Sequence, residues 1–226
     1  MKFYFDPLST SSRPVMLLIH DFGLDIEEVT VNLFLHENLQ PEFLALNPNG
    51  AVPVLDDDGF ILAEGGAILK YLAHKHGLPV YPGSFEEQIR VDEMLSWFTT
   101  NFWAYHCILG TYPQMIPELA GLSPVTRSEM AALGAHGSQR YLSVLDRKLG
   151  EAGPYVCGRD ITIADYEGIS QTTLADFVDF DFSPYPNVQA WIALMRERKG
   201  WDAAFAGFSG LVQAARNERR AAVATA

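Results

Sequence analysis

The sequence predicts a chain of two parts, an α/β domain over residues 1–77 and an all-helical domain over residues 84–226. In the first part, short runs typical of β-strands alternate with stretches that have helical spacing. Residues 77–83 contain Pro79, Pro82 and two glycines, a composition that favours a stiff linker. After this linker, the apolar residues recur at helical intervals only. Together these observations predict an α/β domain joined to a helical one.

The α/β part begins with an aromatic strand at residues 2–5 and a polar loop at residues 6–12. Arg13 and Pro14 then open a helix that ends at Gly23, a residue suited to a left-handed C-cap. A strand follows over residues 28–32, and Pro41 begins a short helix that ends near Leu46. The strand–helix–strand order predicts a parallel strand pair with a right-handed crossover.

The stretch from residue 52 to residue 72 organises this part. It predicts a buried strand at 52–55, an Asp/Gly turn at 56–59, a returning strand at 60–62 and a helix that begins at Glu64. The free N–H groups and the positive dipole end of a helix start can hold a carboxylate. Because Glu64 could hold an ammonium at the same place, the helix start suits the end of an α-amino acid, which carries both groups.

The helical part begins with a long helix from about Ser84, rich in aromatic residues, that breaks near Gly110 or Pro113. Ser123 and Pro124 form an N-cap and N1 pair that starts a second long helix. We expect the apolar residues of this helix to point inward, and they are Met130, Leu133, Tyr141, Leu142, Leu145 and Leu149.

The third helix of this part begins at a capping-box pair, Thr162 and Asp165, whose role is structural and not catalytic. A further helix begins in the segment from Pro184 to Trp191, and residues 216–226 either extend a helix or fray.

The composition excludes several classes of protein. The net charge is −12 and the pI is about 4.8, whereas nucleic acids and anionic membranes bind basic surfaces. No apolar run is long enough to cross a bilayer, and no signal peptide is recognisable after Met1, so we expect a cytoplasmic protein. Cys107 and Cys157 form neither a disulfide framework nor a metal-binding pattern, and the scattered histidines lack ligand spacing, so no metal site is expected.

Residues 51–72 resemble the glutathione-binding half of cytosolic glutathione transferases. The resemblance rests on Ala51-Val52-Pro53-Val54-Leu55, on the acidic turn, and on Leu62-Ala63-Glu64-Gly65-x-Ala67-Ile68-x-x-Tyr71-Leu72. With the polar loop and the Thr162–Asp165 pair it extends from Lys2 to about Phe208. It implies a thioredoxin-like N-terminal domain, an all-α C-terminal domain and a cis bond before Pro53. The chain departs from the family at Gly65, where serine is usual, and this change removes a hydroxyl contact to glutathione.

The resemblance also implies where the catalytic hydroxyl lies, between the first strand and the first helix. Ser9, Thr10, Ser11 and Ser12 lie there, but no tyrosine or cysteine does. Counting back from Gly23, the serine of the theta-like and zeta-like classes corresponds to Ser9, and the cysteine of the bacterial beta-like class corresponds to Ser11. We therefore predict Ser9 as the catalytic residue, with Ser11 and then Thr10 as alternatives. The non-catalytic alternative is that these hydroxyls only cap the helix and stabilise the turn.

The resemblance implies two groups of substrate-binding residues. Those expected to contact glutathione are Asn38, Val52, Pro53, Glu64 and Gly65. The residues expected to contact a second, apolar or aromatic substrate lie on the first long helix, foremost Phe102 and His106. An aromatic stripe of this kind is also typical of a hydrophobic core. Arg13 either orients the loop or pairs with an acid, or is a solvated helix start.

The predicted function is that of a serine-type glutathione transferase, which uses glutathione as co-substrate and conjugates it to a small electrophile. A homodimer is expected because the family usually forms one. Two alternatives stay open at this point: a glutathione-dependent isomerase or dehalogenase on the same site, and a non-catalytic binding or assembly module with the same fold.

Overall fold

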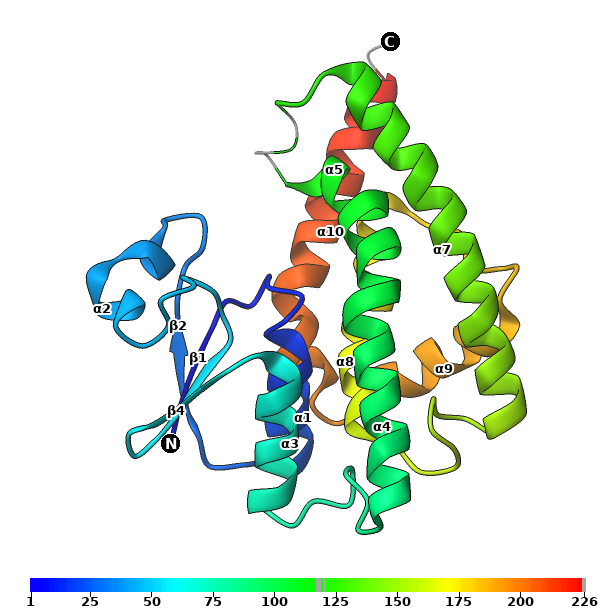
Figure 1. The fold of residues 1–226 in the computed structure, drawn as a ribbon. Helices are drawn as coiled ribbons and strands as arrows, with labels where there is room; N and C mark the ends of the chain where they lie inside the picture. The colour runs from blue at the N-terminus through cyan, green and yellow to red at the C-terminus, as the bar shows by residue number, and fades with distance from the viewer. Residues whose placement is uncertain (117–118, 120, 225–226) are drawn as a thin grey trace.

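The computed structural model describes residues 1–116, 119 and 121–224. Within these residues a four-stranded sheet stands beside a larger group of helices (Figure 1). The strand order is β2-β1-β3-β4, with β1 parallel to β2 and the other neighbouring pairs antiparallel. The sheet is therefore mixed, and the predicted parallel pair with a helical crossover is confirmed.

The strands are β1 (Lys2–Phe5), β2 (Glu27–Thr30), β3 (Val54–Asp57) and β4 (Phe60–Ala63). All four lie within two residues of the predicted strands. The largest differences are of two residues: β2 ends at Thr30, and β3 begins at Val54, directly after the cis Val52–Pro53 bond, and ends at Asp57. The turn between β3 and β4 uses Asp58 and Gly59, both with positive φ.

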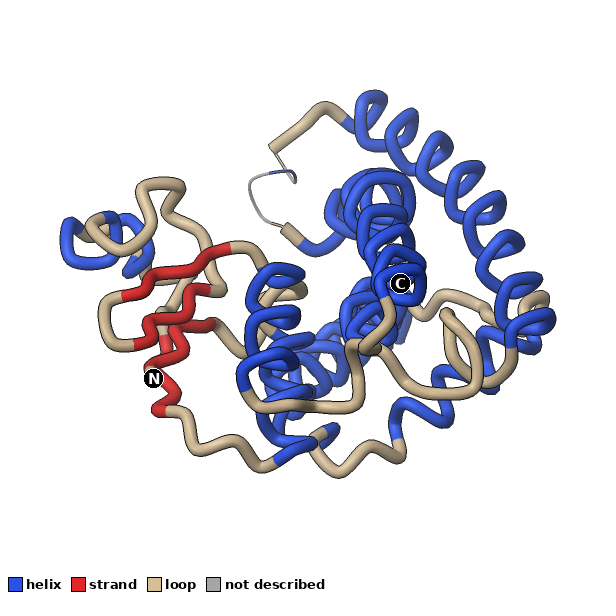
Figure 2. The backbone as a smooth tube through the Cα atoms, turned by 60° about the horizontal axis from the view of Figure 1, so that its bottom comes forward, coloured by secondary structure: helices blue, strands red, loops and turns tan. Residues whose placement is uncertain are grey.

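Helices α1 (Arg13–Phe22) and α3 (Gly65–Lys75) lie between the sheet and the C-terminal helices, whereas α2 (Pro41–Leu44) lies on the other side of the sheet (Figures 1 and 2). Gly23 ends α1 in the left-handed conformation, as predicted, and its N–H bonds to the carbonyl of Ile19. A short 3-10 turn, η1 (Glu37–Leu39), precedes α2.

The helical part opens with α4 (Phe85–Trp97), capped by Ser84, and continues without a break into η2 (Phe98–Thr111), a π-helix. A short helix, α5 (Tyr112–Met115), follows. In η2 the buried side chains recur every four residues from Phe98 to His106, and Cys107 and Thr111 continue this spacing one position later. The expected break near Gly110 or Pro113 is therefore a change of helix type at Tyr112.

The helix α7 (Pro124–Ala152) runs beside η2 and begins at the predicted Ser123 N-cap. Gly134 and Gly137 allow the close approach, since a Cβ at Gly137 would lie 2.1 Å from Tyr105 Cδ1. One expectation is wrong: Leu133 is 52% exposed, because the glycine side of α7 faces η2 and Leu133 points to solvent. Leu142, Leu145 and Leu149 are buried as predicted.

Helix α8 (Ile163–Thr172) is the central helix of this part, and every one of its residues is buried. Its start is the predicted capping box of Thr162 and Asp165. Both Val156 N–H and Trp191 Nε1–H also donate to Asp165 Oδ1, at 2.9 and 3.0 Å, so the carboxylate holds together three segments. Asp165 is a structural residue.

The remaining helices are η3 (Thr173–Val178), α9 (Pro186–Arg196) and α10 (Trp201–Ala224). The C-terminal segment therefore extends a helix as far as Ala224. α1 packs against both α8 and α10, and α3 packs against α8. No helix within the described ranges is long and apolar enough to cross a membrane.

Candidate active site

The loop between β1 and α1 is held in one conformation by the carboxylate of Asp6. Asp6 Oδ1 accepts from Leu8 N–H at 2.7 Å and Oδ2 accepts from Leu33 N–H at 3.0 Å. Ser9 N–H donates to the Asp6 carbonyl, and Ser12 N–H donates to the carbonyl and to the Oγ of Ser9. Ser9 Oγ acts as an acceptor in this last bond, so its own proton is free to be donated elsewhere.

Arg13 also holds this loop in place. Its side chain is fully buried, with Nη1 donating to the Leu8 carbonyl at 2.9 Å and Nη2 to the Ser170 carbonyl at 3.4 Å. The guanidinium also lies 4.1 Å from the ring centroid of Phe208. Burial lowers the pKa of Arg13 to about 10, and the side chain keeps its charge at neutral pH. Arg13 therefore orients the loop and is not a solvated helix start.

A small cavity, which we call the polar cavity, lies where this loop meets the cis bond and the start of α3. It has a volume of about 180 Å³. Its lining includes four residues predicted to contact glutathione, which are Val52, Pro53, Glu64 and Gly65. Ser11 of the loop and Glu167 of α8 line it as well. The sheet edge, the helix start and α8 thus meet at one place.

Glu64 has φ 72° and ψ 115°, a conformation that L-residues rarely adopt. Strain of this kind costs about 1–3 kcal/mol and gathers at functional sites. The conformation places the exposed Glu64 side chain at the mouth of the polar cavity while α3 begins immediately at Gly65. The first N–H groups of α3 have no partner within the helix, so the cavity offers a carboxylate beside unpaired N–H donors.

A second, larger cavity, which we call the apolar cavity, opens on the other side of the loop. Its volume is about 590 Å³. Ser9 and Ser11 lie at its floor, and its walls are mainly apolar side chains from the η1 loop and the helical part, among them Phe34, Trp103, Tyr112 and Phe177. Ser11 lines both cavities, whereas Ser9 and Thr10 line the apolar cavity only, so the two spaces meet at Ser11.

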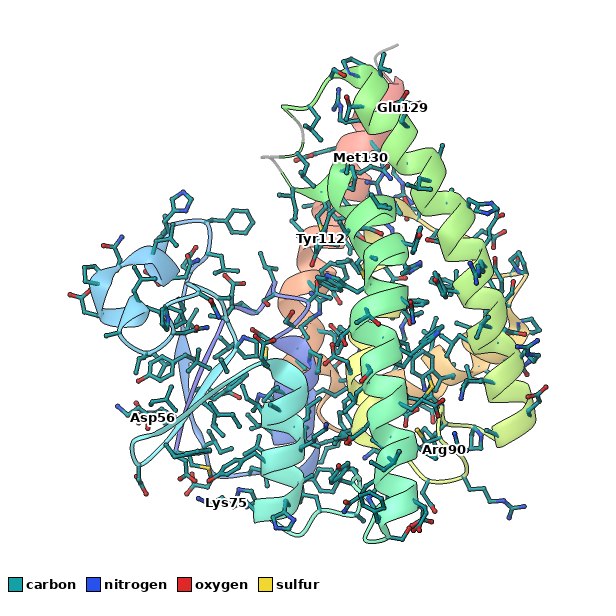
Figure 3. All side chains as sticks on the ribbon, in the orientation of Figure 1. Asp56, Lys75, Arg90, Tyr112, Glu129 and Met130 are labelled. Carbon is teal, nitrogen blue, oxygen red and sulfur yellow. The ribbon has the colours of Figure 1, made fainter. Side chains whose placement is uncertain are left out.

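Tyr112 connects the two parts of the protein across the apolar cavity. Its hydroxyl donates to Thr10 Oγ1 at 3.2 Å, and it lies on the side of the helical part that faces the loop (Figure 3). Thr10 is buried and its carbonyl also accepts from Ser170 Oγ at 2.6 Å. Thr10 Oγ1, like Ser9 Oγ, accepts in its hydrogen bond and keeps its proton, but Thr10 is buried whereas Ser9 and Ser11 are half-buried, so Thr10 is less accessible to a ligand.

Three residues predicted to bind substrate lie elsewhere. Asn38 donates to the Gly50 carbonyl at 2.7 Å and lines neither cavity. Phe102 is fully buried among aromatic rings of the helical core. His106 is 1% exposed, with Nδ1 3.3 Å from Ser138 Oγ and Nε2 3.2 Å from the Thr172 carbonyl. Burial lowers the pKa of His106 to about 4, so it is a neutral core residue.

Other residues of the helical part reach the apolar cavity instead. Phe98, Phe102 and His106 follow one another at intervals of four and share the buried face of η2, whereas Trp103 lines the apolar cavity. An aromatic stripe in the sequence indicates burial, but it does not indicate which residues beside it line a cavity. Tyr112 and Glu167 were not predicted, and no local pattern marks either of them.

Neither cysteine provides a thiolate. Burial raises the pKa of Cys107 well above its usual range, and burial raises that of Cys157 to about 11. Within residues 1–116, 119 and 121–224 no group of three or more His, Cys, Asp or Glu side chains could hold a metal ion. The polar groups that line the two cavities are hydroxyls, backbone N–H groups and carboxylates.

The mixed sheet with its cis-proline edge, joined to a helical part that shares two cavities with it, defines a protein of the glutathione transferase architecture. Residues 3–74 match the family described as "Glutathione S-transferase, N-terminal domain", and residues 102–199 match "Glutathione S-transferase, C-terminal domain". The chain is 31% identical to glutathione S-transferase D7 of Anopheles gambiae over 197 residues, which cover 84% of this chain and 83% of the relative. The chain belongs to the glutathione transferase family.

Solved structures of the family agree with this assignment. The human glutathione transferase theta-2, in complex with glutathione and an unknown ligand, has a TM-score of 0.84 and 26% identity, and the match covers 96% of this chain and 90% of that one. A delta-class glutathione transferase of Nilaparvata lugens has a TM-score of 0.80 and 27% identity, with coverage of 96% and 98%. The predicted fold class is confirmed.

Proposed function

We propose that this protein is a glutathione transferase that activates the thiol of glutathione with a serine hydroxyl. The observation that carries the proposal is the position of the loop: Ser11 lines both the polar and the apolar cavity, and Ser9 lines the apolar one. In this proposal the γ-glutamyl end of glutathione lies at Glu64 and Gly65, and its cysteinyl backbone lies along Val52. The sulfur then stands at the loop, at the edge of the apolar cavity.

The chemistry follows from the pKa of the thiol. A free thiol has a pKa of about 8.5, so only a few per cent is ionised at pH 7. A hydrogen bond donated by Ser9 to the sulfur stabilises the thiolate, and the thiol proton leaves to solvent. A sulfur lone pair then attacks the electrophilic carbon, and the leaving group departs with its bonding pair. The apolar walls of the second cavity favour a small apolar or aromatic electrophile.

The test compares the wild type with Ser9→Ala and Ser11→Ala, with Ser209→Ala on the exposed side of α10 as the control. Calorimetric titration measures glutathione binding, thiolate absorbance against pH measures the thiol pKa, and conjugation of 1-chloro-2,4-dinitrobenzene measures turnover. A hydrogen bond to a charged group contributes about 1.5–3 kcal/mol, so Ser9→Ala is expected to lower kcat/KM about 10- to 100-fold with little change in affinity.

The outcomes separate the alternatives. A lowered thiol pKa that persists in Ser9→Ala and disappears in Ser11→Ala moves the hydroxyl role to Ser11. Binding with no conjugation of any electrophile would leave a non-catalytic glutathione-binding module. If the wild type does not bind glutathione at all, the transferase proposal fails.

We also propose that the protein acts as a homodimer in the cytoplasm. Phe85 and Ile89 lie four residues apart on α4 and are 71% and 48% exposed, a large apolar surface for an isolated subunit. Light scattering coupled to size-exclusion chromatography measures the mass, and a value near 25.1 kDa would contradict the dimer.

A further inference from the structure

Glu167 has a buried carboxyl group whose second oxygen lacks a partner. The residue lies in α8, is 5% exposed and lines the polar cavity. Its Oε1 accepts from Gln171 Nε2 at 2.8 Å, whereas Oε2 has no hydrogen-bond partner within the described part of the chain. A buried polar atom without a partner is costly, and such an atom beside a cavity indicates a group that a ligand completes.

The Glu167 carboxyl lies beside the position that a side chain at residue 65 would take. A Cβ at Gly65 would lie 3.7 Å from Glu167 Oε2 and 3.0 Å from the Ser11 carbonyl oxygen. The second distance is shorter than most real Cβ contacts, so the loop leaves little space for a serine at this position. The missing side chain at Gly65 and the unpartnered oxygen of Glu167 therefore occur together at the start of α3.

The surroundings of Glu167 favour its neutral form. Burial raises its pKa to about 7, and the nearby charge of Glu64 at the N-cap of α3 adds to the rise. Arg13 of α1 is engaged by backbone carbonyls, and Cys107 of η2 is a neutral thiol. The charged groups of α4 have other partners: Asp92 pairs with Lys70, and Arg90 pairs with Glu93. Since Oε1 accepts from an amide, a proton on the carboxyl resides on Oε2, which makes Oε2 a donor aimed at the cavity.

We propose that Glu167, as a neutral carboxylic acid, donates a hydrogen bond from Oε2 to the α-carboxylate of the γ-glutamyl end of glutathione. It thus supplies from the helical part the donor that Gly65 lacks. The inference rests on the proposed function, because it assumes that glutathione occupies the polar cavity. The charges balance in this arrangement: Glu64 faces the ligand ammonium, and the start of α3 together with the neutral acid faces the ligand carboxylate. An ionised Glu167 would instead place a second negative charge against that carboxylate.

The test is calorimetric titration with S-methylglutathione, whose blocked sulfur removes thiol ionisation from the measurement. If only the neutral form of Glu167 binds, the apparent affinity of the wild type falls about tenfold from about pH 6 to about pH 8 through this group. Glu167→Gln keeps an N–H donor and an acceptor in the same shape but cannot ionise. Its pH profile therefore reports the ligand ammonium alone, and its affinity at about pH 6 should equal that of the wild type.

Glu167→Leu removes the donor and should weaken binding about tenfold or more at about pH 6, with its folding checked by circular dichroism. If this variant does not fold, the comparison of the wild type with Glu167→Gln still decides. Parallel pH profiles for these two proteins, or wild-type affinity that rises with pH, overturn the role of Glu167 and leave the proposed function intact. Absence of binding by the wild type and by all variants overturns the proposed function itself.

Discussion

Replacing Asp165 by alanine should destabilise the fold without acting on the chemistry. The Asp165 side chain is fully buried and accepts from three N–H donors: Val156 N at 2.9 Å, Thr162 N at 2.8 Å and Trp191 Nε1 at 3.0 Å. The Thr162 hydroxyl donates as well, at 3.0 Å. In Asp165→Ala these donors are left buried without an acceptor, while the hydroxyl can rotate to another one.

Each buried donor left unpaired costs about 1–3 kcal/mol. Because water can enter part of the vacated space, we expect the lower half of the sum, a loss of about 3–6 kcal/mol in the free energy of unfolding. For a chain of this size the loss corresponds to a melting temperature lowered by roughly 10 °C. Urea denaturation followed by circular dichroism measures it, at one protomer concentration throughout, since dimerisation would link stability to concentration.

Two further variants make the comparison sharp. Asp165→Asn keeps the Oδ1 acceptor for Val156 and Trp191 and should lose less than the alanine variant. Asp160→Ala removes an exposed carboxylate in the same loop and should change stability by no more than about 0.5 kcal/mol. A loss below about 1 kcal/mol in Asp165→Ala, or unchanged stability with lost glutathione binding, would refute the structural role.

Two more predictions concern packing and pH. Gly168→Ala places a Cβ 2.2 Å from Phe98 Cζ in the core and should lower the free energy of unfolding, measured by urea denaturation, by about 1–3 kcal/mol. Gly210→Ala meets open space and should be neutral or stabilising, so equal effects of the two changes would contradict this packing. The pKa of Glu167 is raised from 4.5 to about 7, so between these values the folded protein holds a proton that the unfolded chain has released. The free energy of unfolding should therefore fall by up to about 3 kcal/mol as pH rises across this window and level off above it, and Glu167→Gln should lack this fall; parallel profiles would contradict it.

The local elements were predictable from the sequence because each depends on residues a few positions apart. The Ser123 cap, the C-cap at Gly23 and the Thr162–Asp165 box all form as expected. The cis bond before Pro53 was implied by the family resemblance and is present. The division at residues 77–83 and the roles of the loop hydroxyls stay predictions.

Phe102 and His106, which were expected near the second substrate, are buried in the helical core, the alternative that an aromatic stripe also suggested. Asn38, expected at glutathione, donates from its amide to the Gly50 carbonyl and holds the segment that leads to the cis bond. In both cases the residue type suited the proposed role, and packing against a neighbour decided its direction.

The sequence by itself therefore determined the elements, their order and the loop that carries the hydroxyls, because caps, turns and periodicity act within one or two turns of chain. Only the tertiary structure decided which distant side chains complete the site. Tyr112 reaches Thr10, and Glu167 fills the space beside Gly65, only after α5 and α8 have packed against the N-terminal domain. Burial at that contact also sets the pKa of Glu167, and no local pattern in the sequence records it.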